Sequence, residues 1–144
     1  MQIDLALQAD EELYQAFQRL VLQLTNNNPP PTQEHLLALI NEPSSTLLLA
    51  RNDSGQIVGA LSLTVYHVPT GIRSIIEDVI VDVSARGQGI GDALMTRAIE
   101  LAREKGASNL MLTSNPLRVA ANSLYVKLGF QKRETNAYQL KLSK

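Results

Sequence analysis

The spacing of apolar residues along the chain switches between helical and strand-like repeats. Some stretches place apolar residues every three or four positions, which is typical of a helix with one buried face. The predicted helices are 11–24, 32–41, 90–105 and 116–128. Other stretches are short, apolar and rich in β-branched residues, which favours strands. The predicted strands are 1–6 (an edge strand), 46–51, 56–68, 73–83 and 109–114.

The tail over 130–142 alternates apolar and polar residues on either side of Thr135-Asn136, which predicts a final hairpin. The predicted order is therefore β-α-α-β-β-β-α-β-α-β-β. This order indicates the α/β class, as a mixed sheet with helices on both faces. Parallel pairing is expected only around the strand–helix–strand of 73–114. The connector at 26–31 is too short for a linker, so 1–144 is expected to form a single domain.

Composition removes several classes of function. The chain has no cysteine, which excludes disulfides, thiolate zinc sites and a cysteine nucleophile, and its two histidines leave little for a metal site, so no metal is expected. A net charge of −1 argues against general affinity for nucleic acid. No apolar run approaches the ~20 residues that span a bilayer, and the first residues lack a signal pattern. A cytoplasmic protein without a membrane partner is expected.

Charge is distributed unevenly. Residues 1–82 carry 3 basic and 10 acidic side chains, whereas residues 118–144 carry 6 basic and 1 acidic. This asymmetry fits a cationic substrate together with an anionic cofactor. It fits equally well a scatter of charges on a solvated surface.

A glycine-rich loop, Arg86-Gly87-Gln88-Gly89-Ile90-Gly91-Asp92, joins the strand at 73–83 to the following helix. Glycines allow sharp bends and close approach to a ligand, and a helix that opens at once offers free N–H groups to a phosphate. The third glycine comes one residue too early for a dinucleotide fingerprint, and no Gly-Lys-Ser/Thr is present. A glycine-rich turn without any ligand is the alternative.

Two motifs resemble the GNAT superfamily of N-acyltransferases. Arg86-x-x-Gly89-x-Gly91 resembles its acetyl-CoA loop, and 121–130, with Leu124-Tyr125 and Gly129-Phe130, is similar to its C-terminal helix signature. The resemblance implies the GNAT acyl-CoA N-acyltransferase fold with splayed central parallel strands, acetyl-CoA as co-substrate, and commonly a homodimer. It also implies a set of cofactor-binding residues. These are the backbone of Val79, Ile80 and Val81 with Arg86, Gly87, Gln88, Gly89, Ile90, Gly91 and Asp92.

Glu77 and Asp78 interrupt an apolar strand, and adjacent strand residues are expected to point to opposite faces. Ile-Glu-Asp-Val-Ile-Val is similar to the matching strand of glucosamine-6-phosphate N-acetyltransferases and related small-amine enzymes. That similarity makes Glu77 the candidate catalytic base, acting directly or through water. Two surface acids near a strand end are the alternative.

Tyr125 is the second catalytic candidate, because the resemblance assigns the tyrosine at this position to protonation of the leaving thiolate. As a bare observation, a core aromatic is the simpler explanation of Tyr125. Many relatives carry an asparagine seven residues earlier, where this chain has Arg118. Arg118 is therefore a candidate for a coenzyme phosphate, and Asn115 or Asn122 for the pantetheine contact.

The sequence thus predicts transfer of an acetyl group from acetyl-CoA to a primary amine of a small molecule, by direct attack in a ternary complex. A phosphorylated acceptor is not favoured, because only three basic residues precede Arg86. Two alternatives stay open: acetylation of protein lysines or N-termini, and a sensor domain that binds acyl-CoA without turnover.

Overall fold

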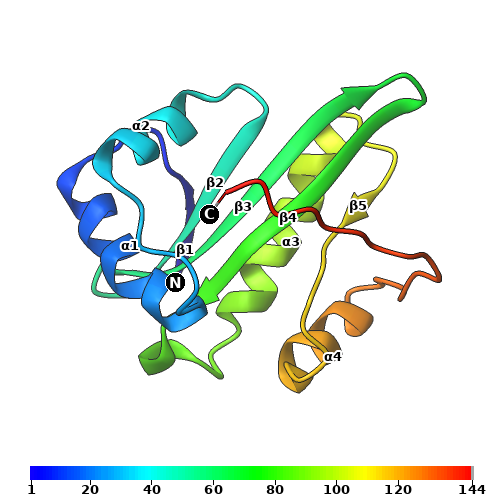
Figure 1. Ribbon diagram of the computed structural model, residues 1–144. Coiled ribbons are helices and arrows are strands. Elements are labelled where there is room, and N and C mark those ends of the chain that lie inside the picture. Colours follow the sequence, from blue (N-terminus) through cyan, green and yellow to red (C-terminus); the bar gives the residue numbers. More distant parts are fainter. Residues whose placement is uncertain (144) are drawn as a thin grey trace. The chain divides into compact units, whose positions relative to one another are not determined.

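The structure, a computed structural model, describes residues 1–143. The chain divides into two compact units, Met1–Thr113 and Ser114–Lys144, and each is described by itself. The first unit carries the sheet and three α-helices, which are labelled in Figure 1. Its elements are β1 (Gln2–Leu5), α1 (Glu11–Leu24), α2 (Gln33–Asn41), β2 (Ser45–Arg51), β3 (Ile57–Val68), β4 (Gly71–Val81), a 3₁₀ turn (Val83–Ala85), α3 (Ile90–Glu104) and β5 (Leu110–Met111).

The sheet of the first unit has the order β1-β2-β3-β4-β5. β1 to β4 pair antiparallel in succession, and β5 pairs parallel with β4. The mixed sheet, the edge position of β1 and the parallel pairing across α3 confirm the predicted class. α3 supplies the long crossover that a parallel neighbour requires.

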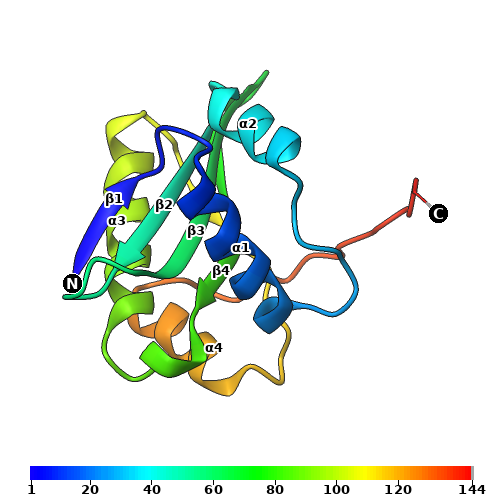
Figure 2. The ribbon, with the colours of Figure 1, turned by 90° about the vertical axis from the view of Figure 1, so that its left-hand side faces the viewer.

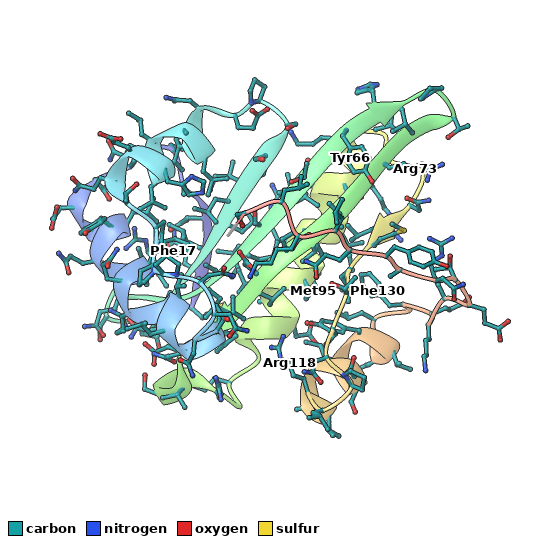
Figure 3. The ribbon with its side chains drawn as sticks, viewed as in Figure 1. Phe17, Tyr66, Arg73, Met95, Arg118 and Phe130 are labelled. Carbon is teal, nitrogen blue, oxygen red and sulfur yellow. The ribbon has the colours of Figure 1, made fainter. Side chains whose placement is uncertain are left out.

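Helices cover both faces of this sheet, as Figure 2 shows: α1 and α2 lie on one side and α3 on the other. The core under α1 and α2 is built from apolar side chains of both helices and of β2, β3 and β4. It contains Leu13, Ala16, Phe17, Leu20, Leu36, Leu47, Leu49, Ile57, Ala60 and Ile80. On the other side Leu94, Met95 and Ala98 of α3 are fully buried. Figure 3 labels Phe17 and Met95, one on each side.

Polar side chains cap the starts of α1 and α2. The side chain of Asp10 accepts a hydrogen bond from the backbone N–H of Leu13, and that of Thr32 accepts one from His35. Each side chain satisfies a donor that the first helical turn leaves without an intrahelical partner. The observed α1, 11–24, matches the predicted helix.

β5 is shorter than the strand predicted over 109–114. Only Leu110 and Met111 pair with β4, through Ser74 and Ile75. The apolar pattern continued beyond them, but the two strands part there. Pairing, rather than the sequence pattern, therefore sets the end of the strand.

The second unit contains α4 (Val119–Lys127). The prediction that this helix begins at residue 116 is wrong, because α4 begins at Val119. The side chain of Asn115 instead accepts the N–H of Leu117, and its carbonyl accepts the N–H of Arg118, which forms a turn before the helix begins. Asparagine at this point favoured a local turn as readily as a helix cap.

The predicted hairpin over 130–142 is also absent, because the described part of this tail, 130–143, contains no strand. Tyr138, Leu140 and Leu142 keep their alternation but are 82–91% exposed. Alternation gives a segment two faces, whereas a strand also requires a neighbour to receive its hydrogen bonds. The pattern alone could not supply that neighbour.

Candidate coenzyme and acceptor site

The edge of β4 that faces β5 is open along half of its length. β5 pairs only with Ser74 and Ile75, so among the described residues no strand pairs with 76–81 on this side. The parting of the two central parallel strands agrees with the splay that the family resemblance implied. An open strand edge can accept an extended ligand that carries amide groups.

A β-bulge in β4 sets which backbone groups face that open edge. The register of β3 and β4 shifts between Ala60 and Ser62, so that Leu61 faces both Asp78 and Val79. Asp78 has a φ of 51°, a left-handed conformation that aspartate tolerates better than most residues. The extra residue reverses the alternation of the strand from this point.

A hydrogen bond at the end of β4 shows which residues after the bulge direct their backbone groups to β3 and which to the open edge. The N–H of Asp82 donates to the carbonyl of Val58 on β3, 2.8 Å away. In an antiparallel ladder every second residue faces the partner, so Ile80 also faces β3. Val79 and Val81 then direct their backbone groups to the open edge. Ile80 directs its backbone groups to β3 instead, and the contact of all three residues with the pantetheine arm stays a prediction.

The glycine loop follows directly and exposes its backbone. Gly87 and Gly89 have φ values of 77° and 80°, and a Cβ added to either would meet nothing within 4 Å. Within the part of the chain that the structure describes, the N–H groups of residues 87–91 donate no hydrogen bond, and the first helical bond of α3 runs from Ala93 to Gly89. Glycine is therefore required at 87 and 89 for backbone conformation, and the result is a row of free donors, exposed over 87–89, that suits a diphosphate.

Arg86 and Asp92 flank this row. The Arg86 side chain is exposed and its Nε lies 3.4 Å from the carbonyl oxygen of Val81, a long contact. Asp92 accepts the hydroxyl of Thr96 in the first turn of α3. The predicted loop residues are thus contiguous in space as well as in sequence, and their contacts with the coenzyme stay predictions.

Asp82 anchors the start of the loop. Its carboxylate, only 11% exposed, accepts the backbone N–H and the hydroxyl of Ser84 and the Nε of Arg19, 3.0 Å away. The N–H of Ser84, together with its hydroxyl and the Arg19 guanidinium, lowers the pKa of Asp82 despite an opposing effect of burial. The sequence interpretation missed this group. The aspartate at a strand end, two residues before a serine, was the available signal for a capping turn.

Glu77 lies exposed on the sheet face that α1 and α2 partly cover. It pairs with Ser62, which in turn pairs with Leu47 of the core under those helices. Paired residues share a face, so the Glu77 side chain is on this side. Asp78 is also exposed, but simple alternation does not apply to it because it belongs to the bulge. The expectation that the two acids point to opposite faces therefore loses its basis.

In the second unit, Tyr125 is 6% exposed and its ring packs edge-on against Phe130, with centroids 6.1 Å apart. The side-chain amide of Asn122 donates to the carbonyls of Asn115 and Arg118, at 2.9 and 2.8 Å. Both asparagines therefore hold the turn before α4. Their contact with the pantetheine arm, like the phosphate contact of the exposed Arg118, stays a prediction.

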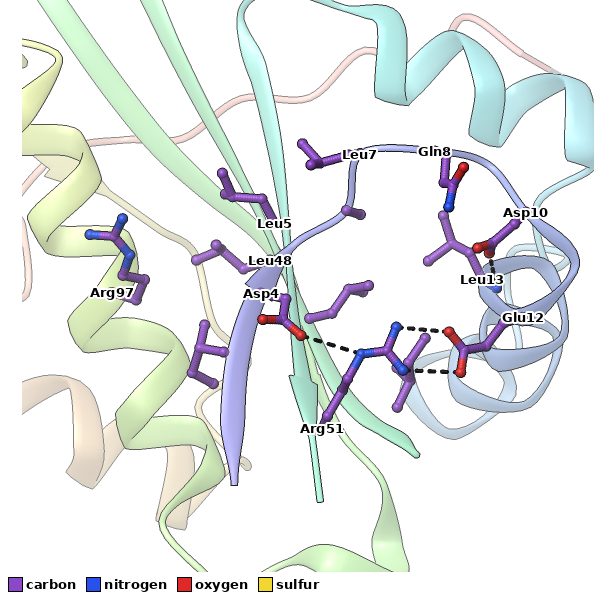
Figure 4. A pocket seen from close by; sticks show the side chains of 14 residues that line it. Asp4, Leu5, Leu7, Gln8, Asp10, Glu12, Leu13, Leu48, Arg51 and Arg97 are labelled. Carbon is purple, nitrogen blue, oxygen red and sulfur yellow. Dashed lines mark hydrogen bonds and ion pairs between the residues drawn. The ribbon is translucent and has the colours of Figure 1, made fainter. Parts of the chain in front are cut away.

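A cavity of about 540 Å³ lies at the β1 edge of the first unit, seen in Figure 4. At its centre the Arg51 guanidinium bonds the Glu12 carboxylate with both terminal nitrogens and lies 3.3 Å from Asp4. These charges satisfy one another, and the cavity contains none of the glycine-loop residues. It is not the candidate site.

Neither a metal-binding cluster nor a membrane-spanning helix is present among the described residues. No group of three or more His, Cys, Asp or Glu side chains there could hold a metal ion. No helix there is both long enough and apolar enough to span a membrane.

Comparison with known proteins places the chain in a family. The model of the acetyltransferase (GNAT) family matches residues 10–130, and the chain belongs to this family. The match covers the glycine loop, the bulged strand and the Tyr125 helix.

The relatives are N-acetyltransferases. The chain is 38% identical over 92 residues to glucosamine 6-phosphate N-acetyltransferase of Trypanosoma brucei brucei. The aligned segment covers 62% of this chain and 60% of the relative. It is 36% identical to mycothiol acetyltransferase of Renibacterium salmoninarum over 58% of this chain but only 25% of the relative. An aminoglycoside acetyltransferase from an uncultured soil sample has the same fold, with a TM-score of 0.81 over 99% of this chain and 96% of that one, at 22% identity.

Proposed function

We propose that the chain is an acetyl-CoA-dependent N-acetyltransferase that acts on a primary amine of a small molecule, within one domain that includes both compact units. The observation that carries the proposal is the row of free N–H groups over 87–91, placed directly after the open edge of β4. In a member of the GNAT family this arrangement suits a ligand with a diphosphate followed by an amide-containing arm.

In the proposed mechanism the loop donors and the dipole of α3 hold the diphosphate. The backbone groups of Val79 and Val81 bind the pantetheine amides, and a peptide N–H near Val79 stabilises the oxyanion as the amine attacks the thioester. Glu77, exposed beside the open part of the strand, accepts the proton that the ammonium must lose. Tyr125 donates a proton to the departing thiolate, which is a fair leaving group without it.

The acceptor is proposed to be a neutral or cationic small amine. Among the described residues of the first unit there are 7 basic and 13 acidic side chains, and Glu77 and Asp78 are both exposed. This balance favours a cation. The glucosamine 6-phosphate and aminoglycoside enzymes among the similar proteins keep phosphosugars and aminosugars in the test panel.

Thiol release from acetyl-CoA tests the proposal cleanly, because the chain has no cysteine to react with the thiol reagent. The panel contains polyamines, arylalkylamines, aminoglycosides, glucosamine 6-phosphate and lysine peptides. Turnover of a small amine is expected. Tight coenzyme binding without turnover of any amine would favour the sensor, and turnover of peptides alone would favour a protein acceptor.

Glu77→Gln tests the base. It is expected to lower kcat/KM at neutral pH by about 10²–10⁴-fold. The loss is expected to shrink as the pH approaches the ordinary amine pKa of about 10, since the free amine then needs no base. Glu34→Gln, an exposed glutamate at the start of α2, is the matched control. An equal loss at every pH would exclude the base role.

A further inference from the structure

Helix α1 holds the beginning of the glycine loop through two side chains one helical turn apart. Arg19 donates its Nε to the Asp82 carboxylate at 3.0 Å and a terminal nitrogen to the carbonyl of Ile57 at 2.6 Å. Gln23, four residues further along the helix, accepts the N–H of Val83 at 2.8 Å. Residues four apart share one face of a helix. The same face of α1 therefore binds two successive residues of the chain that leads into the loop.

Beyond this point the loop is held by little else. Ala85 donates its N–H to the carbonyl of Asp82, whereas within the described part of the chain the N–H groups of residues 87–91 donate no hydrogen bond. The intervening residues 86–89 are exposed, and two of them are glycines with positive φ. The loop is thus a short exposed span between two ends that are held by hydrogen bonds. Contacts that hold an end in place reduce the ordering that a ligand must otherwise impose.

From this geometry we infer that Arg19 and Gln23 are positioning residues for coenzyme binding: from α1 they fix the start of the loop so that its N–H groups meet the diphosphate. The inference rests on the proposed function, since it concerns the same site. Neither side chain touches the ligand in this arrangement, because Arg19 acts through Asp82 and Gln23 through the backbone of Val83. Their effect is confined to the part of the coenzyme that the loop binds.

This confinement separates positioning from general stability. Arg19→Met is expected to raise the KM for acetyl-CoA and the Kd for coenzyme A roughly tenfold, with kcat at saturation unchanged. Arg19→Lys keeps the charge but loses the planar guanidinium, so its KM and Kd are expected to lie between those of wild type and Arg19→Met. With S-acetylpantetheine, which lacks the diphosphate, wild type and Arg19→Met are expected to give equal kcat/KM.

Arg51→Met is the matched control. Arg51 also ties α1 to the sheet, but through Glu12 in the first turn of the helix and from β2, which β3 separates from β4 and the glycine loop. It is expected to lower the melting temperature without changing the Kd for coenzyme A. If Arg19→Met binds coenzyme A as wild type does, or loses acetylpantetheine turnover to the same extent, the positioning role is wrong while the enzyme assignment stands. If wild type itself does not bind coenzyme A, the proposed function fails and the inference falls with it.

Discussion

Gly89→Ala provides the most direct test of the loop. Gly89 sits at the N-cap of α3 with a φ of 80°, and an added Cβ would meet nothing within 4 Å. The substitution therefore introduces no clash, and its cost is that of a left-handed conformation. That cost is about 1–2 kcal/mol for an L-residue, and the less flexible unfolded chain offsets about 0.5 kcal/mol of it.

Gly55→Ala is an unusually close control. Gly55 has a φ of 82° and equally open surroundings, but it lies in the turn between β2 and β3. Both variants should unfold about 1 kcal/mol more easily, a shift of roughly 3 °C in melting temperature. Relaxation of the strained backbone in Gly89→Ala moves the free N–H groups of 87–91, because Gly89 lies among them. Relaxation in Gly55→Ala leaves these groups in place.

Calorimetry with coenzyme A measures the difference. Gly89→Ala is expected to weaken binding by about tenfold or more, the effect of losing or misplacing one or two hydrogen bonds to a charged group. Gly55→Ala is expected to bind as wild type does. Equal affinities for all three proteins would refute the role of the loop backbone, and equal losses would show that stability alone sets the affinity.

Three further predictions concern the frame around the site. The pKa of Asp82 is lowered in the folded state, so the ionised carboxylate stabilises the fold above the unfolded pKa of about 3.9, and this stabilisation is lost as the pH falls through the folded pKa. Between pH 5 and the acid limit, the free energy of unfolding measured with urea should therefore decrease less for Asp82→Asn than for wild type. Gly59→Ala would place its Cβ 3.0 Å from the Ile90 side chain, so it should destabilise the fold by about 1–3 kcal/mol and shift the start of α3, measured by thermal unfolding and coenzyme affinity. Ser74→Ala removes a buried 2.7 Å hydrogen bond to the carbonyl of Asn109, and should cost about 1 kcal/mol in chemical unfolding; no loss would mean that β5 is held by its backbone alone.

Much of the first unit could be predicted from the sequence because its signals are local. The Asp10 cap and the regular apolar spacing give α1, and the turn around Gly55 gives the β2–β3 hairpin. The glycine loop could likewise be predicted, since the positive φ values at Gly87 and Gly89 favour glycine at these positions. Where one residue decides the conformation, sequence reasoning succeeds.

The rest depends on partners far away in the chain. The hydrogen bond between Arg19 and Asp82 joins residues 63 positions apart, and neither residue type indicates which partner the other has. The bulge at Asp78 shows only in the register with β3, because an aspartate inside a strand has several explanations. The length of β5 and the state of the tail depend on whether a neighbour is present, which residue spacing does not record.

The bulge has a consequence for how this strand tolerates change in length. Deleting one residue between Glu77 and Ile80 would restore an unbroken ladder with β3, so the sheet would lose little. Glu77 and Ile80 would keep their partners Ser62 and Ala60, and Val81 would still direct its backbone groups to the open edge. The strand would, however, lose the extra peptide group that the bulge supplies opposite Leu61, beside the groups proposed to bind the coenzyme arm. A change in the length of this strand therefore alters the backbone groups at the open edge more than it alters the pairing of the sheet.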